Sequence, residues 1–491
     1  MSDVALPLGV AAALVALGLA IRAPKLLIPA VVLLLPIEYF STILEDDLGA
    51  SGAGGAVRAM LNPGKAAMAV TVVFAIVRAR HDIRSLLPQS QLVIPLAALV
   101  AILWIGLLWA DSISPPNLVL VVVLYFAFLM VAPSFIEDRK DIDRIVAAVL
   151  IAAIWLGALA VAQRLGGVFQ WRGVLIQSDE ASYRSNATFS DPNILARHLS
   201  LAMALAAGLI LTYGPRRLTV YLALPALLIG GMGILMTASR SGWLLMVLAT
   251  ALMIFLAPIA RYTKLRILGG GGAAVVAMLA LVLAQGGSQA DRIRSLTDRE
   301  SVLGLREFLI KAGWEMFKDN PIHGVGTGGF EHALVTSYID ILPDWARTTL
   351  SHTSLVSILA ELGLIGVVAF GFVGVKLAIV AAKTYAEARE PGERLITGWA
   401  IVAVFGVILQ SQSEGRLLDD PYLWFYAAIL VAMEIRHVTA RSSARWNAGR
   451  LGSSSTTPSA ETGWGGGAEA TGLGPSPPAP RPQLGGEGRA S

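Results

Sequence analysis

Four polar clusters interrupt an otherwise apolar chain of 491 residues. Three clusters carry an arginine, namely Arg184, Arg240 and Arg306, and the fourth carries His352. A guanidinium presents a planar fork of N–H donors that matches phosphate oxygens. A histidine at the start of a helix favours the neutral imidazole, which can accept a proton. Together, these residue types suit a diphosphate-bearing substrate and the activation of a hydroxyl group.

Further polar side chains adjoin these clusters and could support them. Asn193 lies at a predicted helix start, Ser239 precedes Arg240, and Glu361 lies about two helical turns after His352. Each cluster also has a purely structural reading. The polar residues can cap helices, the arginines can anchor helix ends at the membrane interface, and Glu361 can pair within a helical bundle.

A glycine-rich run at 324–330 follows apolar residues with helical spacing that begin at Leu305. The helix must end before Pro321, because proline cannot continue it. Backbone N–H groups in such a run can form an anion-binding nest. The run is not a nucleotide-binding P-loop, because no Gly-Lys-Ser or Gly-Lys-Thr follows it.

The four clusters lack the motifs of several cofactor-dependent enzymes. They contain no His-Glu-x-x-His zinc motif, no Asp-x-Asp pair for a metal-bound nucleotide and no Walker lysine, and the chain has no cysteine. We therefore expect no metal site and no cofactor. The pattern favours a lipid-linked substrate that brings its own leaving group.

The composition indicates the elements that must position these residues. Hydrophobic residues make up 55% of the chain and charged residues 15%, against a usual ~25% charged, and the mean hydropathy is +0.66. Apolar blocks of about 18–20 residues match the thickness of a bilayer. The chain is therefore predicted to be a polytopic membrane protein, which excludes a cytosolic enzyme, a secreted domain and a coiled coil. Basic cytoplasmic loops explain the net charge of +4 without nucleic acid.

The expected fold is an all-α bundle of roughly 12–13 transmembrane helices with a long, partly helical periplasmic loop. The candidate spans are 4–21, 26–44, 64–78, 91–110, 117–135, 144–162, 194–213, 218–236, 241–260, 265–285, 354–375, 394–412 and 421–436. The predicted parts are N-terminal spans in 1–285, the loop in 286–353, C-terminal spans in 354–439 and a disordered cytoplasmic tail in 440–491.

Lys and Arg gather in alternate loops, which predicts the orientation of the chain. The basic loops lie around 22–25, 78–84, 139–144, 216–217, 261–266 and 383–394. These loops are expected on the cytoplasmic side. All four polar clusters then fall on the opposite, outer side of the membrane.

The ordered motifs resemble the O-antigen ligase and O-antigen polymerase superfamily of bacterial membrane glycosyltransferases. The matching stretches are ATFSDPN at 187–193, SRSGW at 239–243, the segment 306–326 and the segment 352–366. The chain departs from the family pattern at Thr353, where the family usually has asparagine, and at Leu355, where it usually has an aromatic residue.

This resemblance implies a multi-pass protein of the bacterial inner (plasma) membrane whose active site faces the periplasm or outer side. It implies metal-independent transfer of a glycan from undecaprenyl diphosphate to an acceptor hydroxyl, in lipopolysaccharide or other surface-polysaccharide biosynthesis. Arg184, Arg240 and Arg306 would hold the diphosphate, and His352 would be the catalytic base. The expected partners are the lipid-linked donor, a glycan, lipid A core or protein acceptor, and membrane lipid.

The residues leave alternatives open. A transporter or flippase of lipid-linked oligosaccharide would also use many spans and intramembrane arginines, but it does not require a structured outer loop with a histidine. Inverted repeats would favour transport, and none is apparent by eye. A peptidoglycan polymerase of the shape-elongation-division group would carry an essential carboxylate on an outer loop. The sequence does not separate a ligase from a polymerase.

Overall fold

The computed structural model describes residues 14–19, 21–38, 62–111, 115–169, 174–175, 183–214, 218–287, 290, 294, 304–343 and 353–453. Contacts divide the chain into two units, Met1–Ala440 and Arg441–Ser491. The description below concerns the first unit, and within the second unit residues 441–453 are helical.

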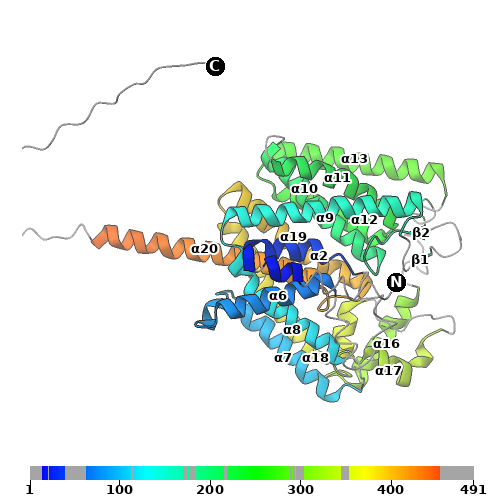
Figure 1. The fold of residues 1–491 in the computed structure, drawn as a ribbon. Helices are drawn as coiled ribbons and strands as arrows, with labels where there is room; N and C mark the ends of the chain where they lie inside the picture. The colour runs from blue at the N-terminus through cyan, green and yellow to red at the C-terminus, as the bar shows by residue number, and fades with distance from the viewer. Residues whose placement is uncertain are drawn as a thin grey trace, which may run out of the picture. The chain divides into compact units, whose positions relative to one another are not determined.

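The described chain is almost entirely helical (Figure 1). Its α-helices are α2 (Leu27–Leu34), α6 (Pro63–Arg78), α7 (Val93–Ile105), α8 (Pro115–Val131), α9 (Arg139–Gly166), α10 (Pro192–Tyr213), α11 (Leu218–Thr237), α12 (Arg240–Leu256), α13 (Arg261–Gln285), α16 (Leu305–Asp319), α17 (Phe330–Ser337), α18 (Ser354–Glu387), α19 (Pro391–Glu414) and α20 (Pro421–Ser453). Short 3-10 turns are η1 (Pro24–Leu26), η2 (Ile83–Leu86), η3 (Gly106–Trp109), η4 (Ala132–Phe135) and η6 (Ile339–Ile341). Two-residue strands β1 (Val174–Leu175) and β2 (Tyr183–Arg184) pair antiparallel, with Val174 opposite Arg184.

The all-α polytopic fold is confirmed. Within the described residues, seven helices are long and apolar enough to cross a membrane, judged by length and composition. Three shorter apolar helices are Pro24–Leu34, Val93–Trp109 and Arg240–Leu256. Most of the predicted span 4–21 and the end of the span 26–44 lie outside the described residues.

Helix α10 forms the centre of the bundle. It packs against α9, α11, α12 and α19, and 89% of its apolar window is buried. Small residues allow these close crossings. A Cβ added at Gly242 of α12 would lie 2.3 Å from the Cβ of Ala196 in α10, and one added at Gly233 of α11 would lie 2.7 Å from the Cα of Gly157 in α9.

A second group of helices packs beside this centre. α2 contacts α6 and α9, α8 contacts α6 and α7, and α18 joins α7 to α19 (Figure 1). The two helices of the long loop, α16 and α17, pack on α18. α16 spans Leu305–Asp319, so the helix predicted before Pro321 is confirmed.

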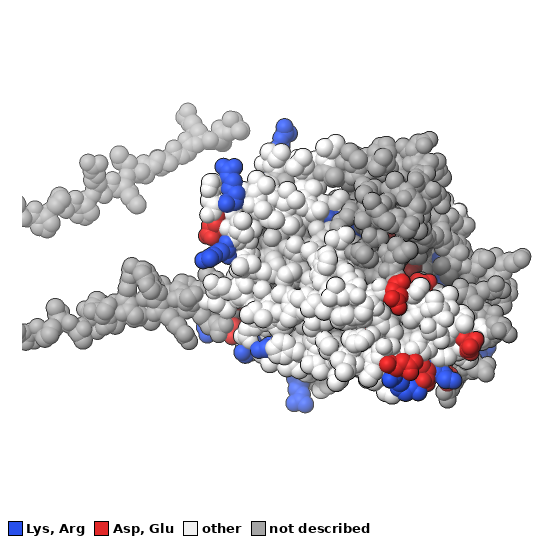
Figure 2. Space-filling view, turned by 90° about the horizontal axis from the view of Figure 1, so that it is seen from below, with Lys and Arg blue, Asp and Glu red and all other residues white. Residues whose placement is uncertain are grey.

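The described loops gather at two opposite ends of this unit. One end, here called the basic end, holds the ion pairs Lys25–Asp141 at 3.2 Å and Arg139–Glu390 at 3.5 Å. The other, here called the loop end, holds α16, α17 and the β1–β2 pair (Figure 1). On the face drawn in Figure 2, charged side chains lie mostly toward these ends, and the surface between them is largely uncharged.

Candidate functional site

At the loop end, Asn193 joins two chain segments that carry candidate residues. Its side-chain Oδ1 accepts hydrogen bonds from Nη2 of Arg184 at 2.8 Å and from Oγ of Ser239 at 2.7 Å. Arg184 also donates from Nε to the carbonyl of Thr237 at 2.9 Å. Ser239 lies 46 residues beyond Asn193 in the sequence, and the structure brings it into one hydrogen-bonded group with Arg184 and Asn193.

The start of α12 is built to present Arg240. Ser239 caps the helix by accepting from the Gly242 N–H at 3.1 Å, and Arg240 is the first helical residue and half-buried. Ala238 has φ of +49°, a left-handed conformation that a residue with a Cβ seldom adopts. Such strain persists only where surrounding contacts fix the turn, and here the Asn193–Ser239 bond provides one.

Arg306 reaches this group from the first turn of α16. Its Nη2 donates to the carbonyl of Ser413, at the end of α19, at 2.9 Å. Burial lowers the pKa of Arg306, and the neighbouring charge of Arg240 lowers it further, whereas Asp191 and Glu414 oppose the shift. Two guanidinium groups are thus held close together in a partly desolvated place.

A buried triad of charged side chains stabilises the turn between α19 and α20. Arg197 of α10 pairs with Glu414 at 3.2 Å and also bonds to Asp420. The three side chains are at most 3% exposed. Asp420 in turn caps α20 by accepting from the Tyr422 N–H at 2.8 Å. The triad fixes both ends of the turn that carries Arg416.

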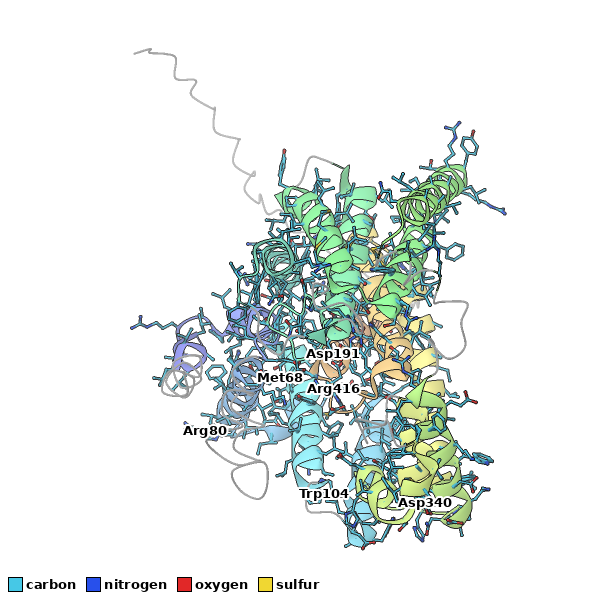
Figure 3. All side chains as sticks on the ribbon, turned by 90° about the vertical axis from the view of Figure 1, so that its right-hand side faces the viewer. Met68, Arg80, Trp104, Asp191, Asp340 and Arg416 are labelled. Carbon is cyan, nitrogen blue, oxygen red and sulfur yellow. The ribbon has the colours of Figure 1, made fainter. Side chains whose placement is uncertain are left out.

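Sequence reasoning missed Arg416. Its side chain is 44% exposed and lies 3.9 Å from Oε2 of Glu38, which itself accepts from the backbone and hydroxyl of Ser190. Figure 3 shows Arg416 close to Asp191, and their charges interact. The signal was available, since a largely polar segment at 410–420 separates two apolar spans.

Several backbone N–H groups of the glycine-rich turn, which the sequence offered as a possible anion nest, donate to other groups of the protein. Three of these N–H groups bond to α18, where Gly363 breaks the helix with φ of +59°. The N–H groups of Val325 and Gly326 donate to the carbonyls of Ala360 and Glu361, both at 2.9 Å. The Gly328 N–H donates to the Glu361 carboxylate at 2.8 Å. The group that the turn holds is therefore the carboxyl group of Glu361.

His352 lies outside the described residues, which resume at Thr353. The start of α18 next to it is tied to the end of α19. Ser354 donates from Oγ to the carbonyl of Ser411 at 3.0 Å, and the Leu355 N–H donates to Oε1 of Gln412 at 3.2 Å. This is the helix end that also receives Arg306 through Ser413.

Two adjoining cavities lie beside the turn between α19 and α20. One, of about 230 Å³, has polar lining that includes Ser354, Ser357, Glu361 and Asp419. The other, of about 350 Å³, is lined almost entirely by apolar residues of α7, α8, α18, α19 and α20. The two share Ile358, Leu417 and Leu418.

The arrangement is suited to a multiply charged anion. Guanidinium donors from β2, α12 and α16 converge around the starts of α10 and α12, and helix N-termini also favour negative charge. Among the described residues, no three His, Asp or Glu side chains are grouped so as to hold a metal ion.

Fold and site together define a polytopic helical membrane protein with a cluster of arginines at one end of its bundle. Residues 225–371 match the family model described as O-antigen ligase. The match supports the resemblance to the O-antigen ligase and polymerase superfamily over this part of the chain, and that family suggests glycosyl-transfer activity. It includes Arg240 and Arg306, whereas Arg184 precedes it. No curated protein matches the chain at a significant level.

Proposed function

We propose that the chain transfers a glycan from undecaprenyl diphosphate to an acceptor hydroxyl. The observation that carries this proposal is the pair of partly buried guanidinium groups of Arg240 and Arg306, with Arg184 bound to the adjoining Asn193. Like charges held together repel, and the attraction of each guanidinium group to a bound diphosphate would offset that repulsion. The family match supports a lipid-linked glycan as the substrate class.

The proposed reaction is a single displacement at the anomeric carbon. The acceptor oxygen forms a bond to that carbon, and the bond from the carbon to the phosphate oxygen breaks with its electron pair. Undecaprenyl diphosphate leaves, and the configuration at the anomeric carbon inverts. Arg184, Arg240 and Arg306 stabilise the negative charge that grows on the leaving diphosphate, an effect worth about 10²–10³ in rate for one well-placed donor.

His352 is the proposed base that takes the proton of the acceptor hydroxyl. His352 immediately precedes Thr353 in the sequence. Ser354 is bonded to the end of α19 that also binds Arg306, which supports a position for the base beside the diphosphate. General base catalysis typically contributes about 10²–10⁴-fold in rate.

The cavities support a lipid-linked donor and a hydroxyl-bearing acceptor. The apolar cavity of about 350 Å³ adjoins the site and could hold part of an isoprenoid chain. The polar cavity of about 230 Å³, with its serines and carboxylates, could receive acceptor hydroxyl groups. We further propose that the basic end faces the cytoplasm and the loop end faces the periplasm, following the distribution of Lys and Arg.

The test uses purified protein with an undecaprenyl-diphosphate oligosaccharide in EDTA, and it follows both glycan length and release of the lipid diphosphate. Arg306→Gln and Arg240→Gln are expected to lower turnover by about 10²-fold or more. Lys311→Gln, an exposed cation on the same helix as Arg306, is the matched control and should retain activity. Full activity of both arginine variants and of His352→Ala would overturn the assignment.

The same assay distinguishes the remaining readings. A ladder of longer glycans without a second acceptor identifies a polymerase. Turnover only after addition of lipid A core or a protein acceptor identifies a ligase. Loss of turnover in EDTA that added metal restores would contradict the metal-independent mechanism. Movement of intact lipid-linked oligosaccharide across a vesicle membrane, without glycan transfer, would identify a transporter.

A further inference from the structure

A third cavity, of about 440 Å³, lies at the basic end, far along the helices from the arginine cluster. It opens between α9, α10, α11, α19 and the middle of α20, and the proposed glycosyl transfer does not use it. Its inner walls are apolar, with Val146, Leu209, Leu222 and Ile396 from four different helices. An apolar hollow at the end of membrane-spanning helices is suited to an acyl chain rather than to water.

Three arginines form the rim of this cavity. Arg139 donates to the hydroxyl of Tyr213 at 2.7 Å and Arg144 to Asp141 at 2.8 Å. Arg436 donates to the carbonyl of Glu137 at 2.7 Å, and its Nε is buried with no hydrogen-bond partner among the described residues. A guanidinium has five N–H donors, so each rim arginine keeps donors for a ligand oxygen.

Three carboxylates share the same rim, namely Asp143, Glu390 and Glu393. Glu390 lies 3.5 Å from Arg139 and Glu393 lies 3.7 Å from Arg436, while Asp143 is exposed. The formal charges of the rim therefore cancel. A purely anionic headgroup would gain from the arginines but would be repelled by the carboxylates, whereas a headgroup with both signs of charge can satisfy both sets.

We propose that this cavity binds one phospholipid with a phosphoethanolamine headgroup. Its phosphate lies on the rim arginines, its ammonium donates to the rim carboxylates, and an acyl chain lies along the apolar walls. Such a lipid would bridge α9, α10, α19 and α20 at the basic end. Basic pockets between transmembrane helices on the cytoplasmic side are known to bind lipid headgroups, and the carboxylates beside these arginines favour a headgroup that also carries a positive charge.

The test uses the full-length protein, delipidated in detergent, with native mass spectrometry to count bound lipids. Phosphatidylethanolamine, phosphatidylcholine and phosphatidylglycerol with the same acyl chains are titrated in parallel. Phosphatidylethanolamine is expected to bind about tenfold more tightly than either of the others, because only it provides both a phosphate and an ammonium that donates hydrogen bonds. Equal or tighter binding of either other lipid would overturn the proposal.

Two matched variants locate the site. Ala147 lines the cavity on α9, so Ala147→Phe should fill it and abolish binding of phosphatidylethanolamine. Ala158→Phe adds the same side chain at an exposed position of the same helix and should leave binding unchanged. Asp143→Asn should reduce the preference over phosphatidylcholine by removing one partner of the ammonium. Unchanged binding in Ala147→Phe would place the lipid elsewhere and refute the assignment.

Discussion

Arg197 is predicted to be the residue at the loop end whose replacement destabilises the protein most. Its side chain is 2% exposed and holds Glu414 and Asp420, which bound the turn between α19 and α20. Arg197→Met keeps a long side chain but removes the positive charge. Two buried carboxylates then lose their shared cation, and the turn that carries Arg416 loses its tie to α10.

The expected cost follows from the burial of the triad. Removing one partner of a buried ion pair costs about 3–5 kcal/mol. Burial raises the pKa of Asp420, and Arg197 opposes that rise. Without Arg197, Asp420 should take up a proton, which limits the cost to the lower end of the range. A loss of about 3 kcal/mol corresponds to roughly a 10²-fold change in the unfolding equilibrium.

The assay is reversible unfolding in mixed detergent, followed by tryptophan fluorescence. Arg197→Met is compared with the triple variant Arg197→Met, Glu414→Gln, Asp420→Asn, which removes the charges together and keeps the cap on Tyr422. The triple variant should recover more than half of the lost stability. Arg84→Met, at an exposed site, should change stability by no more than about 0.5 kcal/mol. The reasoning fails if the single variant loses under about 1 kcal/mol, or if the triple variant recovers nothing.

Three further predictions concern the turns and caps. Gly324 has φ of +68°, and an added Cβ would lie 2.3 Å from the backbone carbonyl carbon of Glu361. Gly324→Ala should therefore destabilise the protein by about 1–3 kcal/mol in the same assay. Gly270→Ala is the control, because Gly270 has open space around it on helix α13, and it should stabilise the protein by about 0.5–1 kcal/mol. Gln163 both donates to and accepts from the backbone of Ala187, so Gln163→Met should cost about 1–3 kcal/mol; a neutral result contradicts that role. Backbone hydrogen bonding lowers the pKa of Asp138, so its stabilisation is present above the unfolded pKa and is lost as pH falls through the folded pKa. The free energy of unfolding of Asp138→Asn should therefore fall less than that of the wild-type protein as the pH is lowered. An unchanged pH dependence of the free energy of unfolding would contradict this.

Much of the fold could be predicted because bilayer thickness leaves few choices for an apolar block of this length. The break in helix α18 could not be predicted from the sequence. Gly363 sits in an apolar run without proline, and the helix bends there because the chain at 321–326 supplies backbone hydrogen bonds. That pairing joins a loop to a span, and hydropathy carries no information about it.

The candidate site could likewise be predicted only in part. Arg184, Arg240 and Arg306 could be selected because they lie on the predicted outer side, Arg184 and Arg240 near predicted spans and Arg306 on the predicted helix of the loop. The triad of Arg197 could not be predicted in detail, because its two carboxylates lie more than 200 residues further along the chain. They reach Arg197 only because α10 packs against α19. The contacts of Arg416 have the same origin.

The hydrogen bonds of the glycine-rich turn help to explain how Arg306 is held. At the start of α16, Arg306 bonds to Ser413. Just beyond its end, the N–H groups of Leu364 and Ile365 donate to the carbonyls of Pro321 and Ile322 at 2.9 and 3.2 Å. The helix is therefore anchored at both ends before any substrate binds. Donors fixed in advance need no reorganisation when charge develops on a leaving group. Glu361 thus supports the proposed chemistry from a distance, by fixing the turn that fixes α16.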